Sequence, residues 1–158
     1  MVSGTLVHTD GTGASVELGP GECAVLSAGA GVRHSELSGD RATRFVQVWL
    51  TPDDPDATPA YRTAAAPAGS GLVRVAGDGG PLAVGVGGAA FEVARLEAGE
   101  TLTLPAAPKV HAFVATGALL RSSLAEPLSA GDAFLLTSGT SYDVTAAVPT
   151  ELLVWSFA

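Results

Sequence analysis

The chain has 158 residues and a formal net charge of −8, and 47% of its residues are hydrophobic whereas only 15% are charged. A composition this apolar can bury a core, which excludes wholesale disorder, and the surplus of acidic residues disfavours direct binding to the phosphate backbone of a nucleic acid. The apolar runs are far shorter than the roughly 18 residues that a membrane-spanning helix needs. The single cysteine, Cys23, excludes an internal disulfide and a zinc site built from several thiolates. Residues 1–5 have neither the basic start nor the apolar core of a signal peptide, so we expect a soluble cytoplasmic protein.

Short strands, separated by glycine and proline, are predicted along most of the chain. Residues 14–18 alternate between apolar and polar side chains, which is typical of a strand with one buried face. A turn at 19–22 and an apolar strand at 23–26 follow, and the β-branched and aromatic residues at 44–50 predict a central strand. Further strands are expected at 101–104, 110–115, 119–124, 133–136, 142–146 and 152–157. Short strands at this spacing predict an all-β sandwich or barrel.

The segment 51–70 interrupts this pattern. It contains four prolines, three aspartates and an alanine-rich stretch, which favours a linker or a surface crossover whose apolar residues could still pack on a barrel. We therefore expect a partial first module at 1–50, a linker at 51–70 and a second module at 71–158. Because about 50 residues rarely close a barrel alone, the first module is expected to be incomplete or to borrow strands from the second.

Two turns of similar sequence indicate an internal duplication without establishing one. Gly-Pro-Gly-Glu stands at 19–22, and Ser-Ala-Gly-Asp stands at 129–132. Each turn is followed at once by a short apolar strand, at 23–26 and at 133–136. The similarity is confined to these few residues.

His34 and Glu36 form the most informative motif. Side chains at positions i and i+2 of an extended chain point to the same face, so this imidazole and this carboxylate can converge on one ion. The pair suits Fe, Mn, Co, Ni or Zn, among which geometry would have to select. By itself, such a triplet is also compatible with a solvated pair on a loop. Gln47, a polar residue in an apolar strand, is either a cavity residue that bonds a ligand or a structural amide.

Further motifs surround this triplet in a fixed order. They are Gly-Thr-Leu-Val-His-Thr-Asp at 4–10, Ala-Gly-Ala-Gly at 28–31, His-Ser-Glu at 34–36, Gln-Val-Trp at 47–49 and Pro-Ala-Tyr at 59–61. This series resembles the pirin family of bicupins, and residues 71–158 are compatible with the second cupin of that family through more generic motifs. The resemblance implies an all-β fold of cupin-type β-barrels, in which the first barrel is incomplete and the second is complete.

The resemblance also implies a single non-haem metal ion, usually iron, in the first cupin. Family members bind it through an H-x-H pair on an early strand and through the histidine and glutamate that correspond to His34 and Glu36. The H-x-H pair would precede the segment aligned with Met1, and the chain shows no such pair. We therefore expect Fe(II), or another divalent transition metal, to bind weakly or not at all. A gene model that starts too late, a degenerate pirin and a homodimer that supplies the missing strands are all open explanations.

The other histidines have less distinctive surroundings. At the position of His8 the family histidine is not a ligand, so we expect a strand histidine with a satisfied hydrogen bond at the pocket, with a ligand role as the alternative. His111 shares a predicted strand face with Phe113, and we expect it in the core or at a pocket rim of the second cupin. Cys23 alternates with Val25 and is expected to be a small buried residue.

Three functions remain under consideration. The first is a pirin-like binding or regulatory module without catalysis, whose partner is a small aromatic ligand or another protein. The second is a metal-dependent dioxygenase of the quercetinase type, in which Glu36 is both a metal ligand and a proton acceptor. The third is a single cupin that binds a small molecule in the second barrel, which residues 110–113 and 119–136 would line.

Overall fold

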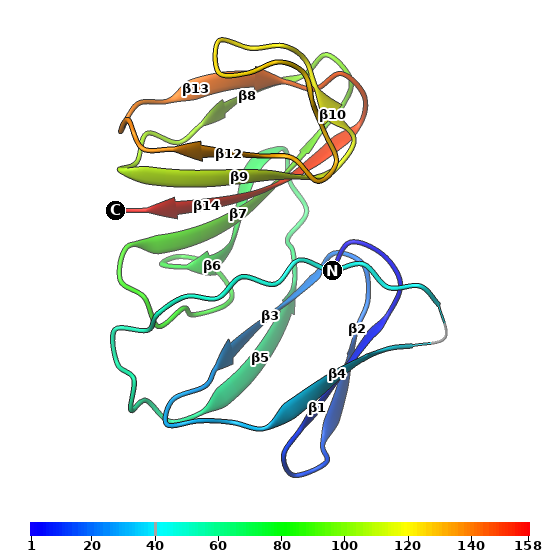
Figure 1. The fold of residues 1–158 in the computed structure, drawn as a ribbon, viewed down its shortest axis with the longest axis vertical. Coiled ribbons are helices and arrows are strands. Elements are labelled where there is room, and N and C mark those ends of the chain that lie inside the picture. The colour runs from blue at the N-terminus through cyan, green and yellow to red at the C-terminus, as the bar shows by residue number, and fades with distance from the viewer. Residues whose placement is uncertain (40) are drawn as a thin grey trace. The chain divides into compact units, whose positions relative to one another are not determined.

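The computed structural model describes residues 1–39 and 41–158, and these residues form β-strands without any helix (Figure 1). The all-β fold class is therefore confirmed. The described part of the chain accordingly has no helix that could cross a membrane. The strands are β1 (Leu6–Asp10), β2 (Ser15–Leu18), β3 (Glu22–Ser27), β4 (His34–Ser38), β5 (Ala60–Ala65), β6 (Gly71–Gly77), β7 (Ala89–Leu96), β8 (Thr101–Leu104), β9 (Lys109–Thr116), β10 (Ala118–Leu119), β11 (Leu128–Ser129), β12 (Ala133–Leu136), β13 (Tyr142–Thr145) and β14 (Thr150–Phe157).

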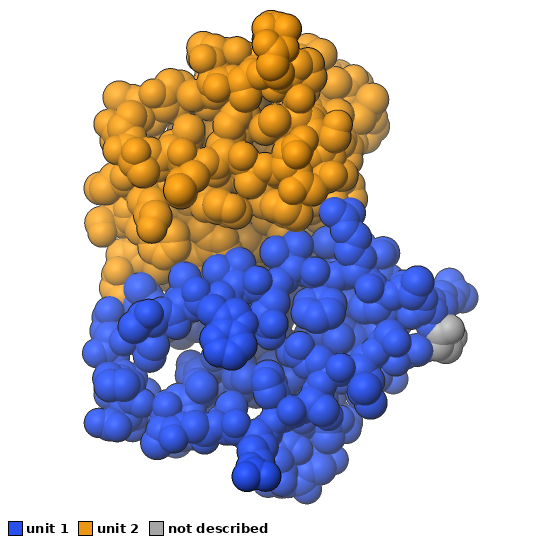
Figure 2. Space-filling model, in the orientation of Figure 1, with its two compact units in different colours: residues 1–66, 82–86 blue, residues 67–81, 87–158 orange. Residues whose placement is uncertain are grey.

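The chain divides into two compact units, which Figure 2 shows in different colours. Unit 1 comprises residues 1–66 and 82–86, and unit 2 comprises residues 67–81 and 87–158. Strand β5 lies within the segment 51–70, where the sequence predicts a linker. It forms an antiparallel ladder with β3, which explains why this part of the segment belongs to unit 1.

Unit 1 contains two small sheets. One has the strand order β2-β1-β4, and the other pairs β3 with β5. The turn between β1 and β2 closes on Asp10, whose carboxylate accepts hydrogen bonds from the Thr12 hydroxyl and from the backbone N–H groups of Thr12 and Ala14. The hydroxyl bond is the main reason why the pKa of Asp10 lies below its ordinary value. Because β1 is paired on both sides, its inward-facing Leu6 and His8 are buried and firmly placed.

Unit 2 contains a five-stranded sheet with the order β12-β9-β14-β7-β6, together with the pairs β8-β13 and β10-β11. Alternation along the strands separates core from surface, as in β8, where Leu102 and Leu104 are buried and the threonines between them are exposed. The core cluster comprises Ala94, Leu96, Leu102, Leu104, Val110, Ala112, Val114, Leu119, Phe134, Val144, Ala146, Leu152 and Val154. These side chains come from both the large sheet and the short pairs, so the core lies between the two.

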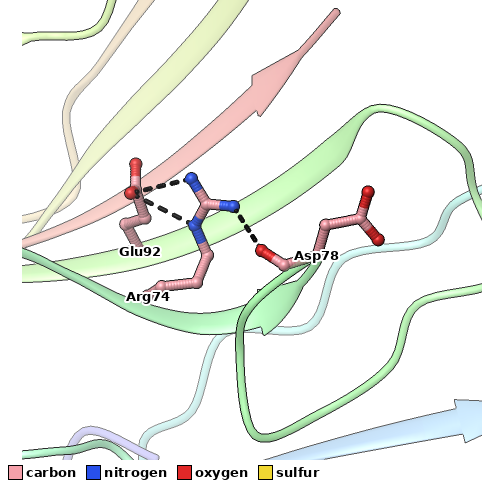
Figure 3. A network of polar contacts seen from close by, with 3 residues as sticks. All are labelled: Arg74, Asp78 and Glu92. Carbon is pink, nitrogen blue, oxygen red and sulfur yellow. Dashed lines mark hydrogen bonds and ion pairs between the residues drawn. The ribbon is translucent and has the colours of Figure 1, made fainter.

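Arg74 connects β6 to β7 and to the turn that follows β6 (Figure 3). Its Nε donates a hydrogen bond to Glu92 Oε1 at 3.2 Å, and its Nη1 donates one to the backbone oxygen of Asp78 at 2.9 Å. The ladder between β6 and β7 shifts register between Arg74 and Ala76, so a β-bulge lies beside this network. The Arg74 guanidinium thus links the bulged strand β6 to its neighbour β7.

Among the described residues, one type of turn occurs at three places, and the sequence analysis recognised two of them. At 19–22, 97–100 and 129–132, the first residue donates its backbone N–H to the carboxylate of the fourth, and the fourth donates its N–H to the carbonyl of the first. The third residue is a glycine with positive φ, namely Gly21 (79°), Gly99 (82°) and Gly131 (104°). A type II turn requires this conformation at its third position, which explains the recurring glycine. The turn occurs once in unit 1 and twice in unit 2, and the instance at 97–100 was not recognised in the sequence.

The prediction of a central strand at 44–50 was wrong. Within the described residues, only Arg44 takes part in a β-bridge there, with Ser3. Trp49 is 85% exposed, and Phe45, Val46 and Val48 are also exposed. Apolar side chains favour a strand only when a neighbouring strand offers backbone partners and a face to cover, and in the described structure no strand pairs with this segment beyond that bridge.

Candidate metal site

Three residues with metal-ligating side chains meet on the ladder between β1 and β4. His8 on β1 lies directly opposite Glu36 on β4. His34 precedes Glu36 by two residues on β4, so both side chains point to the same face of the sheet. The strand pairing therefore brings His8 to the pair that the sequence analysis had already placed on one face.

The three side chains are close enough to share one ion. A ligand atom from each of His8, His34 and Glu36 lies within 4.8 Å of the corresponding atoms of the other two. His8 Nδ1 is 3.7 Å from Glu36 Oε1, and the rings of His8 and His34 have their centroids 5.1 Å apart with an interplanar angle of 63°. Two imidazoles and one carboxylate are a donor set that divalent iron and its neighbours in the first transition series accept.

His8 provides the test of whether these residues fit a metal ion. Its side chain is only 2% exposed, and neither of its ring nitrogens has a hydrogen-bond partner among the described residues. Most buried polar atoms in proteins form at least one hydrogen bond. Two ring nitrogens without a hydrogen-bond partner therefore require an explanation. The expected satisfied hydrogen bond of His8 is thus absent from the described structure. A metal ion at the cluster would be coordinated by one of these nitrogens, which has no hydrogen-bond partner in the described structure.

Tyr61 from β5 completes this part of unit 1, and the sequence analysis gave it no role. Its ring stacks on that of His8, with centroids 3.9 Å apart and an interplanar angle of 4°. Burial raises the pKa of Tyr61 above its ordinary value, and the nearby Glu36 carboxylate raises the pKa further. The hydroxyl is therefore protonated at neutral pH. Its only sequence signal was its place in the Pro-Ala-Tyr motif.

A pocket of about 270 Å³ opens beside the cluster, within unit 1. Its lining residues are His8, Asp10, Gly11, Thr12, Leu26, Val32, Arg33, His34, Pro59, Ala60 and Tyr61. Both histidines of the cluster form part of its wall, and the volume is close to the lower limit for small-molecule sites. Gln47 lies outside this lining, on the exposed segment that follows Arg44.

The Ala-Gly-Ala-Gly motif before β4 has a steric explanation. Gly29 has a φ of 51°, and a Cβ at this position would lie 1.8 Å from the backbone oxygen of Ala57. Only glycine therefore allows the loop before β4 to approach the loop before β5.

His111 and Cys23 lie away from this cluster. His111 stands on β9 in unit 2, where it is half-buried and pairs across the sheet with Trp155 and Leu135. Cys23 stands on β3 and is half-buried rather than fully buried as expected. The chain has three histidines, so the cluster contains the two that belong to unit 1.

Several known proteins are similar to this chain in sequence. The family model described as Pirin matches residues 1–50. A putative quercetin 2,3-dioxygenase of Mycobacterium tuberculosis is 36% identical over 165 residues, which cover 98% of this chain and 67% of the relative. The quercetin 2,3-dioxygenase of Escherichia coli K12 is 35% identical over 63 residues, which cover 39% of this chain and 27% of that protein.

A solved structure extends the similarity to both units. The crystal structure of a bacterial pirin from Escherichia coli in complex with nickel(II) matches with a TM-score of 0.83 and 25% identity, covering 99% of this chain and 69% of that one. The similarity confirms the cupin-type β fold. This chain therefore spans about two thirds of the length of these two relatives.

Proposed function

The chain belongs to the pirin family of cupin proteins, and we propose that it is a metal-dependent dioxygenase of the quercetin 2,3-dioxygenase type. The observation that carries this proposal is the position of His34 and Glu36 beside a pocket of about 270 Å³. The printed names of the relatives from Mycobacterium tuberculosis and Escherichia coli support the reaction class. The nickel(II) complex of the Escherichia coli pirin supports a divalent metal.

His34 and Glu36 would hold the metal, because they occupy the positions that the family resemblance assigns to ligands. The metal would supply a Lewis-acidic centre at which dioxygen and an enol are brought together, whichever of Fe(II), Ni(II), Co(II) or Mn(II) is bound. The chain itself contributes the surrounding groups. Glu36 would accept the proton of the enol hydroxyl, because it is the carboxylate of the cluster.

The pocket walls suit a small aromatic substrate. Leu26, Val32 and Pro59 provide apolar surface that would pack on a ring and exclude water from it. Arg33 lies at the same pocket and would offset the negative charge of the enolate that forms when the proton leaves. A flavonol has these features, namely a planar ring system and an enol hydroxyl, and is therefore the first substrate to test.

A non-catalytic binding or regulatory module is the second candidate. The observation in its favour is that the group of described residues that could hold a metal ion has only three members, His8, His34 and Glu36. A site with fewer protein ligands binds its metal more weakly, which favours a role in which a small aromatic ligand or a protein partner is bound without turnover. Cytoplasmic location and self-association as a homodimer remain proposals for either function.

Oxygen uptake distinguishes the two candidates. Purified protein is loaded in turn with Fe(II), Ni(II), Co(II) or Mn(II), and dioxygen consumption is measured together with the loss of flavonol absorbance. The dioxygenase proposal expects stoichiometric uptake of both reactants, lost in His34→Gln and Glu36→Gln and retained in His111→Gln, which alters a histidine of unit 2. Flavonol and metal binding without oxygen uptake would establish the binding module instead.

A further inference from the structure

We infer that His8 is a ligand of the metal, so that this chain binds its ion through His8, His34 and Glu36. The inference rests on the metal binding of the proposed function but not on the dioxygenase reaction. It departs from the family resemblance, which gives the histidine at this position no ligand role and assigns two of the ligands to an H-x-H pair that the chain does not contain.

The burial of His8 is the first reason. A neutral imidazole has one N–H donor and one nitrogen acceptor, and both nitrogens of His8 are buried without a hydrogen-bond partner in the described structure. Nδ1 faces Glu36 Oε1 at 3.7 Å, which is too long for a hydrogen bond. Two atoms that each lie about 2.0–2.2 Å from one ion are separated by roughly 3–4 Å, so this distance suits two ligands of the same metal.

The fixed position of the ring is the second reason. His8 lies on the central strand β1, directly opposite Glu36, so the ladder determines the separation of their backbones. The ring of Tyr61 stacks in parallel on the ring of His8 and limits its rotation about the side-chain bonds. The imidazole is therefore held at the cluster before any ion arrives, as a metal ligand should be.

The resulting donor set has a chemical consequence. Two histidines and one carboxylate that leave further positions open are the arrangement used by non-haem Fe(II) oxygenases. His8 and His34 both form part of the pocket wall, so a ligand in the pocket would approach these open positions. All three of these residues belong to unit 1.

The alternative is that His8 only positions Glu36 through a hydrogen bond after a small movement. Metal affinity does not separate the two roles, because loss of a residue that orients a ligand also weakens binding. Direct observation of the imidazole nitrogens does separate them. A histidine that binds the metal shows a large shift of one ring-nitrogen resonance, whereas a histidine that only orients the carboxylate retains an uncoordinated ring.

The experiment uses the full chain labelled with ¹⁵N-histidine and titrated with Zn(II) as a diamagnetic substitute for Fe(II). Three histidines give three sets of ring signals, assigned by their loss in His8→Gln, His34→Gln and His111→Gln. If His8→Gln fails to fold, the other two variants assign His8 by elimination. We expect the signals of His8 and His34 to shift at one equivalent of zinc while those of His111 stay in place.

Each result has a distinct meaning. A shift of His34 alone would overturn the role of His8 and leave the proposed metal site standing. Shifts of both histidines would establish the inference even if no oxygen uptake is found, in which case only the dioxygenase proposal would fail. No shift at His8 or His34 would overturn both the inference and the metal binding on which it rests.

Discussion

The two units of this protein differ in the size of their apolar core and in whether they contain candidate metal ligands. Unit 2 buries an apolar cluster between a five-stranded sheet and its short strand pairs. Among the described residues of unit 1, the buried side chains with large apolar groups are Leu6, Leu18 and Leu82, and they share the interior with His8. The candidate metal ligands all belong to unit 1, whereas the large continuous core belongs to unit 2. The unit with the smaller core thus carries the polar cluster, and a bound ion would supply part of its cohesion.

The largest expected effect concerns the core of unit 2. Leu152→Ala removes a side chain that is 1% exposed, and the resulting cavity should lower the free energy of unfolding by about 2–5 kcal/mol. Urea unfolding followed by hydrogen exchange in β7, β9 and β14 measures this loss. Leu135→Ala, at a position of the same sheet that is 61% exposed, is the matched control and should change stability by less than about 0.5 kcal/mol. Equal losses in the two variants would contradict the assigned core.

Metal binding should stabilise unit 1 selectively. At a free Zn(II) concentration of 100 times the dissociation constant, linkage predicts a gain of about 2.7 kcal/mol in the unit that binds the ion. Hydrogen exchange should therefore slow in β1 and β4 and stay unchanged in β9 and β14. His34→Gln should remove the effect. Equal protection of both units would show that the difference between them is not caused by the site.

The stacking of Tyr61 on His8 should make a smaller contribution. Tyr61→Ala removes an aromatic pair, which contributes about 0.5–1.5 kcal/mol beyond the buried area, and should weaken zinc binding because the His8 ring becomes mobile. Tyr61→Phe retains the stack and should keep the affinity of the unsubstituted protein. Calorimetric titration of both variants measures the difference. If Tyr61→Phe were as impaired as Tyr61→Ala, the hydroxyl rather than the ring would be the important group.

The smallest effect is a difference between the two tyrosines, one in each unit. Burial raises the pKa of Tyr61 above 10.0, whereas hydrogen bonds with Ser138 and Thr140 lower the pKa of Tyr142 below 10.0. In the metal-free protein, Tyr142 should therefore ionise at a lower pH than Tyr61, which absorbance at alkaline pH measures in Tyr61→Phe and Tyr142→Phe, each of which retains one tyrosine. The reverse order of ionisation would contradict the different environments of the two side chains.

These shifts also fix the sign of the stability change with pH. Above about pH 10 the unfolded chain loses the Tyr61 proton while the folded chain keeps it, so Tyr61 lowers stability as the pH rises through that range. Tyr142 acts in the opposite direction just below pH 10, because the folded chain loses its proton first. Unfolding in urea at pH 7 and pH 10.5, with each phenylalanine variant, measures the two contributions.

The sequence predicted the class of the fold better than its details. Alternation in residues 14–18 and 101–104 corresponds to β2 and β8, because a strand with one buried face imposes a period of two on its sequence. The same reasoning failed at 44–50, where apolar composition was present but Trp49 remained exposed. Strand formation there depends on a partner, and a pattern within one segment carries no information about its neighbours.

The candidate site, like the fold, could be predicted from the sequence only in part. His34 and Glu36 share a face because of a spacing that can be recognised in the sequence alone. The approach of His8 and Tyr61 depends on the register of β1 with β4 and on the position of β5, which join residues far apart in the chain. Local patterns do not determine such pairings, so the sequence analysis assigned His8 a hydrogen bond and Tyr61 no role.

The recurring turn has a consequence for how the chain reaches this structure. All the bonds that close it lie within four residues, at 19–22, 97–100 and 129–132. Such contacts form in roughly the microseconds typical of hairpins, whereas β14 must find β7 and β9 from a distant part of the chain. We therefore expect the three turns to form early in both units, and Gly99→Ala, at a φ of 82°, to lower the folding rate in stopped-flow measurements.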